Sequence, residues 1–280
     1  MGRGYRELSI MQYSSRQLAP FAPACRGVSQ ACGRYLARWV ILLLILGTAA
    51  DAADTGLILN KVAMAYGGVE RLAETTVWQQ YGTTVSAMHP KPGEVHRAFR
   101  YPDRLRIEIS YEEGSSELRI LSGAVAWNRG EQVSGGMYSA LLLQAARLGL
   151  PNTLIDHRNR LRDTGIMTGR NGNSLRSLEL VFHGNLRLLV GIDPETGRIL
   201  ESRSFMQTGQ GHAMEFAASY DDFRMVEGRL FAFRETLYMM GKQSGQTLLE
   251  RIELAEQLPE ELFDGTSPAR PGPGQHIARQ

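Results

Sequence analysis

The sequence predicts an α+β fold in which one large, curved antiparallel sheet carries helices on a single face. Three observations lead to this prediction. Apolar and polar residues alternate over much of the chain, which is the period of a half-buried strand. The predicted strands follow one another through short turns, which is typical of an antiparallel meander. Helical spacing is confined to two regions, so the crossover helices of a parallel sheet are missing.

The first 53 residues have the composition of an export signal. Arg34 and Arg38 precede the apolar run Val40–Leu46, and the small residues around Ala50–Ala52 offer a cleavage site. The run is shorter than the roughly 20 apolar residues that a stable transmembrane helix needs. Residues 1–53 therefore predict a cleaved signal peptide or an uncleaved inner-membrane anchor, and the periplasm is the expected compartment.

Charge and cysteine content exclude several classes of function. The 280 residues carry a formal net charge of +2, and the positive excess lies in residues 1–53, with six arginines against two acids. A basic N-terminal segment followed by a slightly acidic remainder of the chain is not the pattern of a nucleic-acid-binding protein. Cys25 and Cys32 both precede the expected cleavage site. The mature chain is then expected to have no disulfide and no cysteine nucleophile.

After the signal region the chain alternates between helical and strand-like stretches. Apolar residues with helical spacing run from Asp54 to the stop at Gly67–Gly68, and Val69–Ala73 adds a short second turn. A strand is predicted over Thr76–Val85. The prolines of His89–Gly93 predict a loop.

The clearest strand pattern lies between residues 95 and 109. Apolar residues occupy the odd positions Val95, Phe99, Tyr101, Leu105, Ile107 and Ile109. Polar residues such as His96, Arg106 and Glu108 occupy even positions, so one face is expected to be dry and the other wet. The pattern resumes after a polar turn at residues 112–116, and a slip beside Gly123, before Trp127, predicts a bulge.

Residues 137–150 predict an unusually apolar helix. Their sequence is MYSALLLQAARLGL, in which only Gln144 and Arg147 are clearly polar, and Pro151 ends the helix. A helix that is apolar over most of its circumference must be covered. Either the sheet covers it as part of a dry core, or the helix is the lid of a site where a ligand supplies that cover.

Beyond Pro151 we expect one short helix over residues 152–161 and then strands and turns only. The predicted strands are Leu178–Phe182, Leu186–Ile192, Ile199–Met206, Met214–Tyr220, Leu230–Tyr238 and Thr247–Leu254. Residues 265–280, rich in proline and glycine, predict a disordered tail. A sheet of roughly ten strands must curl. A curled sheet with a helix across its mouth encloses an apolar trough.

Four stretches of turn and strand carry a resemblance to a known family. They are YPDRLRIE from Tyr101, LSGAVAWNRG from Leu121, IDPETGRIL from Ile192 and SYDDFRMVEGRLF from Ser219. In their order and spacing the chain resembles the LolA/LolB superfamily of periplasmic lipoprotein carriers and related lipid-binding proteins, over about residues 54–264. The resemblance implies an open half-barrel that holds acyl chains on its concave side, under a helical lid.

One position departs from that family. Its carriers usually place an arginine directly before the proline of the first motif, where this chain has Tyr101. Arg100, one residue earlier, should point to the opposite face of a regular strand. The resemblance therefore favours binding of a lipid or of an acylated partner over transport of lipoproteins in particular.

These inferences give a set of expected ligand-binding residues: Trp78, Phe99, Tyr101, Leu105, Ile107, Ile109, Trp127, Leu141, Leu142 and Leu148. The expected function is a periplasmic carrier that shields acyl chains in an apolar trough, with a membrane protein as a further partner. Two alternatives remain open: a protein-interaction or sensor module of the same fold, and a hydrolase with an unrecognised site.

Nothing in the sequence points to a cofactor, a metal or a catalytic centre. His89 and His96 have no carboxylate at metal-ligand spacing, and no nucleophile-elbow motif occurs. We therefore expect a binding protein and not an enzyme.

Overall fold

The computed structural model describes residues 54–207 and 213–265. The predicted signal segment and the predicted tail from residue 266 onward lie outside the described residues, as do residues 208–212. In the described part, thirteen strands form one sheet in which all hydrogen-bonded neighbours are antiparallel. This confirms the predicted α+β fold with a single antiparallel sheet.

The strands form two runs along the chain. The first run is β1 (Val77–Ser86), β2 (His89–Arg100), β3 (Arg104–Tyr111), β4 (Ser116–Ser122), β5 (Val125–Asn128) and β6 (Glu131–Val133). The second run is β7 (Arg162–Thr168), β8 (Ser174–Val181), β9 (Arg187–Ile192), β10 (Ile199–Gln207), β11 (Ala213–Val226), β12 (Arg229–Met239) and β13 (Lys242–Leu254).

The helices are few and mostly short. Residues 54–65 are helical, followed by α2 (Val69–Glu74), α3 (Gly135–Leu148) and α4 (Asn152–Asp156). Three single turns of 3-10 helix are η1 (Arg158–Arg160), η2 (His183–Asn185) and η3 (Glu260–Phe263). Within these described ranges, no helix has both the length and the apolarity that a membrane crossing requires.

The strand order explains why α3 crosses the sheet. The order is β6-β5-β4-β3-β2-β1-β13-β12-β11-β10-β9-β8-β7, so the two runs meet where β1 pairs with β13. The edge strands β6 and β7 are consecutive in the chain, and α3 and α4 connect them. A connection between opposite edges of one sheet has to pass over one of its faces.

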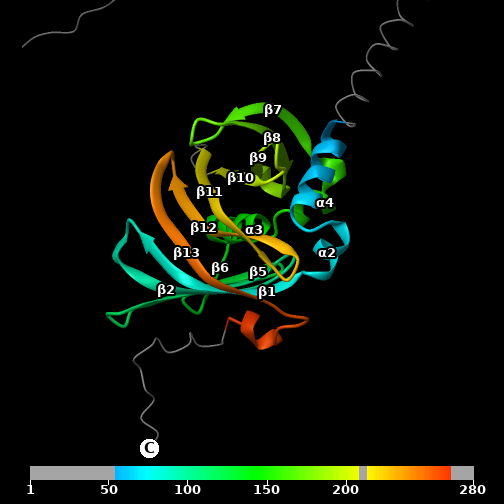
Figure 1. Cartoon of the computed structure of the whole chain (residues 1–280). Coiled ribbons are helices and arrows are strands. Elements are labelled where there is room, and N and C mark those ends of the chain that lie inside the picture. Colours follow the sequence, from blue (N-terminus) through cyan, green and yellow to red (C-terminus); the bar gives the residue numbers. More distant parts are fainter. Residues whose placement is uncertain (1–53, 208–212, 266–280) are drawn as a thin grey trace, which may run out of the picture. The chain divides into compact units, whose positions relative to one another are not determined.

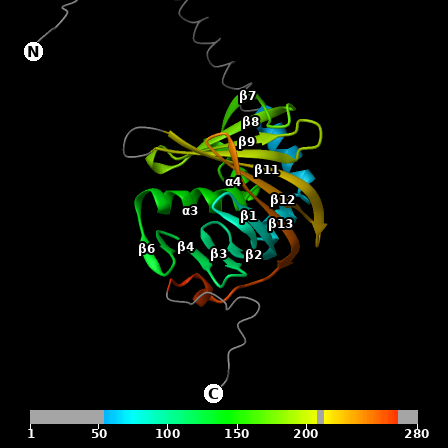
Figure 2. The ribbon, with the colours of Figure 1, turned by 90° about the vertical axis from the view of Figure 1, so that its left-hand side faces the viewer.

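The sheet curls around α3. The two halves of the sheet lie on either side of α3 (Figures 1 and 2), which contacts β4 and β5 in one half and β10 in the other. A register shift between Tyr81 and Gly82 interrupts the central β1–β13 ladder, and a side chain at Gly82 would collide with the carbonyl of Leu248. Such a bulge increases the local twist and bend of a sheet.

The concave face is apolar in both halves, and the helices cover it as predicted. Leu141 and Ala145 of α3 pack with residues of β1, β2, β3, β12 and β13 in one cluster. The helix of residues 54–65, α2 and α4 pack with β8, β9 and β10 in a second cluster. The concave side is therefore the main core of the described unit.

The convex face is not the wet surface that the sequence predicted. Phe263 in η3 and Leu258 before it form a third cluster with Ala98, Leu118 and Ile120. Arg106 of the even-numbered face donates a hydrogen bond to the carbonyl of Leu262 in this C-terminal segment, and Arg106, Glu108 and His96 are all buried. Alternation predicted the two faces of the strand, but it could not show that a distant segment returns to cover the second one.

Several element boundaries differ from the predictions. The slip beside Gly123 is not a bulge but the turn between β4 and β5, with Ser122 paired to Val125. Residues 89–93, predicted as a loop, belong to β2, and their prolines lie where the β1–β2 ladder is interrupted. Proline is tolerated there because no ladder hydrogen bond is required of it.

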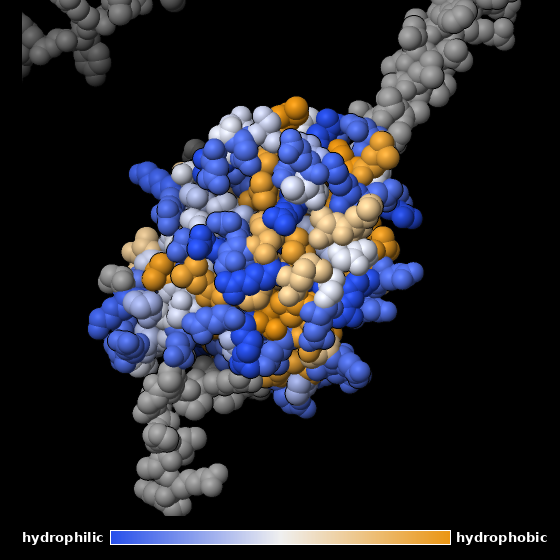
Figure 3. Space-filling view, in the orientation of Figure 1, coloured by the Kyte–Doolittle hydropathy of each residue, from blue (hydrophilic) through white to orange (hydrophobic). Residues whose placement is uncertain are grey.

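In a space-filling view, hydrophobic side chains gather near the middle of one face and hydrophilic ones surround them (Figure 3).

Candidate ligand-binding site

Most of the residues expected to bind a ligand meet under α3. Trp78, Phe99, Leu105, Ile107, Ile109 and Leu141 belong to one buried cluster, and Tyr101, Leu142 and Leu148 pack at its margin. The strand residues face the helix because odd positions of β2 and β3 share the concave face. The candidate site is therefore formed by β1, β2 and β3 of one half of the sheet and by the helix that crosses it.

Trp127 is the exception, and its predicted place on the concave face is wrong. It packs against the convex cluster of Leu118, Ile120 and Phe263. The turn at Gly123 pairs Trp127 with Ile120 and Ala126 with Leu121, so Ala126 takes the concave position. The apolar partner that makes this possible is the C-terminal segment, which no local pattern reveals.

Tyr101 and Arg100 point in opposite directions, as the sequence predicted. The Tyr101 hydroxyl donates a hydrogen bond to Asp156 of α4 at 2.7 Å, and the ring packs against the cluster under α3. Arg100 lies on the convex side, where its guanidinium pairs with Glu260 of η3. Tyr101 thus ties the end of β2 to the helical connection.

Three aromatic rings and one arginine pack together at the centre of the sheet. The Trp78 ring lies 4.8 Å from that of Phe99 and 5.6 Å from that of Phe231. The guanidinium of Arg229 stands 4.6 Å from the Trp78 ring and donates a hydrogen bond to the carbonyl of Thr75. Burial lowers the pKa of Arg229 to about 10.

A second group of charged residues lies in the interior and was not among the expected site residues. Arg97 of β2 and Arg147 of α3 both pair with Glu235 of β12, at 2.9 and 3.1 Å. All three side chains are at most 10% exposed. Burial raises the pKa of Glu235, but the two arginines outweigh this effect and hold the pKa below its ordinary value.

The sequence did contain a signal for these three residues. Arg97 occupies an odd position in the apolar row of β2, and Glu235 lies two residues after Phe233 in β12. Arg147 is the one charged residue within α3. Each is a charge in a periodic apolar row, which is a pattern that predicts a buried ion pair or a polar part of a ligand site.

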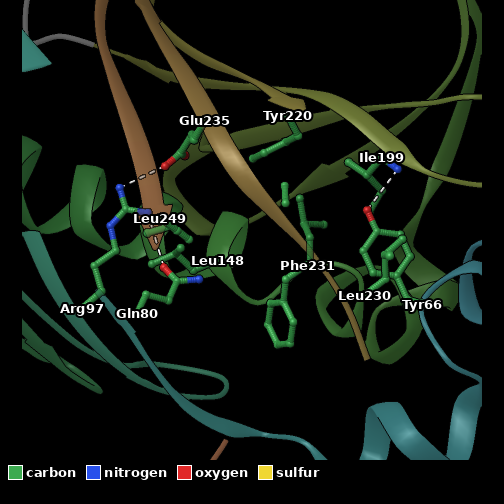
Figure 4. Close-up of a pocket in the computed structure, with 12 residues that line it drawn as sticks. Tyr66, Gln80, Arg97, Leu148, Ile199, Tyr220, Leu230, Phe231, Glu235 and Leu249 are labelled. Atoms are coloured by element: carbon green, nitrogen blue, oxygen red, sulfur yellow. Dashed lines mark hydrogen bonds and ion pairs between the residues drawn. The ribbon is translucent and has the colours of Figure 1, made fainter. Parts of the chain in front are cut away.

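Two cavities flank this ion-paired group. The smaller, of about 70 Å³, is lined by Arg97 and Glu235 together with Tyr66, Gln80 and Tyr220, and by apolar residues that include Leu148 and Phe231 (Figure 4). The larger, of about 200 Å³, lies beside α3 and is lined by Arg147, Gln144, Leu143 and Leu237 among others. Pockets for drug-sized ligands measure roughly 300–1,000 Å³. Neither cavity can hold an acyl chain while α3 is in place.

The histidines singled out in the sequence have structural contacts. His89 stacks on Tyr111, with ring centroids 4.2 Å apart, and lies 3.3 Å from Glu117. His96 contacts Glu108 and Gln79. Over residues 54–207 and 213–265, no group of three or more His, Cys, Asp or Glu side chains is arranged to hold a metal ion.

Comparison with solved structures finds proteins of similar architecture. A LolA superfamily protein from Nitrosomonas europaea is 11% identical, with 75% of this chain and 97% of that chain covered and a TM-score of 0.49. A DUF1329 family protein from Desulfovibrio piger is 9% identical, with the same coverage and a TM-score of 0.43.

Comparisons based on sequence give no match. No family model matches the chain, and no curated protein does. Structural similarity at such low identity concerns the course of the backbone and gives no information on the ligands of this chain.

Proposed function

We propose that this protein binds the acyl chains of a lipid or of an acylated partner on the concave side of its sheet, with α3 as a displaceable cover. We further propose that it acts as a periplasmic carrier of such chains. The observation that carries the proposal is the position of α3. It fills the concave side as a separate layer and pairs with no strand in the described sheet.

Displacing α3 leaves the sheet intact. The helix is held by side-chain packing of Leu141, Leu143 and Ala145 and by the ion pair of Arg147. No ladder hydrogen bond is lost when such a helix moves, and an apolar ligand replaces the contacts that the helix gives up. The exchange of apolar contacts therefore has a small net cost, and the buried ion pair of Arg147 is the contact that opposes opening.

The two ends of α3 differ in how firmly they are held. Residues 134–137 are exposed, and Gly135 and Gly136 have room around them. At the other end, Gly149 lies so close to Tyr101 and Thr153 that a side chain could not be added without displacing them. We expect α3 to open from its N-terminal end and to pivot near Gly149.

The need for a cover follows from the chemistry of the cargo. An acyl chain of about fifteen methylenes costs on the order of 12 kcal/mol to hydrate, at roughly 0.8 kcal/mol per methylene. A carrier must hide this surface when loaded and must hide its own apolar lining when empty. The small size of the two cavities beside α3 supports a closed position of this helix in the proposed cycle.

Native mass spectrometry tests the proposal. The mature protein, purified gently from a lipid-containing source, should carry lipid in stoichiometric amount, and the delipidated protein should take up a fluorescent fatty acid. A clean apo mass together with no uptake would contradict lipid binding. Capture of one stoichiometric protein without lipid would instead favour the interaction-module alternative.

A further inference from the structure

The interior of the sheet carries an excess of positive charge that the proposed function does not use. We propose that Arg97 and Arg147 bind the anionic headgroup of the ligand, so that this protein selects acidic single-chain amphiphiles over neutral ones. The inference rests on the proposed function, because the chain of such a ligand must occupy the space under α3.

The first argument is the charge balance. Arg97 and Arg147 share Glu235, and no other carboxylate in the described part of the chain lies within 4.0 Å of either guanidinium. Two buried cations against one buried anion leave one positive charge without a counter-charge. A buried charge of this kind is costly unless a partner compensates it. An entering anion would supply that partner.

The second argument is the unused hydrogen-bonding capacity. The Nε atoms of Arg97 and Arg147 are buried and have no hydrogen-bond partner, whereas Glu235 lies 2.9 Å from Arg97 through one oxygen and 3.1 Å from Arg147 through the other. Guanidinium groups bind carboxylates and phosphates through several donors in a fixed plane. The two free donors on neighbouring arginines are suited to an oxyanion.

The third argument is location. Arg97 and Glu235 line the smaller cavity, and Arg147 lines the larger one beside α3. Apolar side chains adjoin the ion-paired group on both sides, with Phe231 and Leu249 in the smaller cavity and Leu237 in the larger. The larger cavity is lined mainly by apolar groups and adjoins Arg147, so a headgroup at the arginines and a chain along the path of α3 match the two parts of an amphiphile.

Three sixteen-carbon probes test the inference on the unaltered protein: hexadecanoic acid, hexadecanol and hexadecyl phosphate. Their affinities are measured by competition with a neutral fluorescent lipid. We expect at least one of the two acidic probes to bind about tenfold more tightly than the alcohol, which corresponds to one charge-assisted hydrogen bond in a buried site. The stronger of the two acids identifies the headgroup as carboxylate or phosphate.

Two substitutions should shift the preference in opposite directions. Arg147→Gln removes the uncompensated charge and should lower the ratio of acid affinity to alcohol affinity about tenfold. Glu235→Gln adds to the positive excess and should raise the same ratio. Both changes also break the ion pair that holds α3, so the ratio, and not either affinity alone, is the quantity compared. Arg147→Lys keeps the charge and is the matched control, and circular dichroism checks that each variant is folded.

The outcomes separate the two proposals. Equal affinity for acids and alcohol in the unaltered protein would overturn the headgroup assignment and leave chain binding in place. Failure to bind any of the three probes would overturn both. The comparison of acid with alcohol needs no variant, so it decides the question even if a substitution prevents folding.

Discussion

At the scale of single residues, charged side chains are buried on both faces of the sheet. Glu108 on the convex side accepts hydrogen bonds from Arg106 and lies 3.4 Å from the Nδ1 atom of His96. Burial raises its pKa, but His96 and Arg106 together outweigh burial and lower the pKa to about 2. A carboxylate held in this way stabilises the fold only while it is ionised.

The first prediction concerns acid stability. The contribution of Glu108 is complete above its unfolded pKa of about 4.5 and is lost as the pH falls toward 2, because the unfolded state then binds the proton more readily. We expect Glu108→Gln to lower the free energy of unfolding at pH 7 by about 2–3 kcal/mol. Urea unfolding at several pH values measures both effects.

The matched control is Glu253→Gln, which affects an exposed pair with Arg251. Exposed pairs contribute little, so stability should change by less than about 0.5 kcal/mol. If Glu108→Gln kept the acid dependence of the unaltered protein between pH 4.5 and 2, the assigned role of Glu108 would be wrong.

At the scale of elements, the proposed function requires α3 and a ligand to compete for the same surface. Leu141→Ala should lower the free energy of unfolding of the ligand-free protein by about 2–4 kcal/mol, because the Leu141 side chain of α3 is fully buried between the helix and the sheet. The same change weakens the closed state, so apparent affinity for an apolar ligand should rise. Urea unfolding and titration with a fluorescent fatty acid measure the two quantities.

Leu178→Ala is the control for this second prediction. Leu178 is equally buried but lies in the other cluster, on β8. The substitution should cost similar stability and leave affinity unchanged. Weaker binding by Leu141→Ala, with the control unaffected, would show that Leu141 supports the site and does not cover it.

The elements also show which parts of the fold the sequence could reveal. Alternation between residues 95 and 109 placed Phe99, Leu105 and Ile107 on the concave face, and the composition of residues 137–150 identified α3. Both are local patterns with a fixed period. The place of Trp127 was missed because it depends on Phe263, which is far away in the sequence.

At the scale of the whole molecule, one long-range pairing decides the architecture. β1 and β13 meet at the centre of the sheet, where Trp78 lies opposite Leu254. Local patterns predict strands and turns but not which distant strands pair, so the sequence could not show that α3 connects the two edges. Local patterns mark Arg97, Arg147 and Glu235 singly as charges among apolar residues, but their mutual pairing was missed for the same reason, since the three come from distant elements.

The account depends on movement of α3 relative to the sheet, and a distance between two spin labels measures this directly. With Cys25 and Cys32 replaced by serine, the chain has no other cysteine, and labels can be placed at the exposed Met137 of α3 and Met239 of β12. A second pair, at Ile166 of β7 and Met239, reports on the sheet itself.

Pulsed electron paramagnetic resonance gives both distances with and without hexadecanoic acid. A helix that leaves the interior must move by about its own diameter, roughly 10 Å. We predict a change of this size for the Met137–Met239 pair and little change for the control pair. An unchanged Met137–Met239 distance in protein that holds the ligand stoichiometrically would contradict the account.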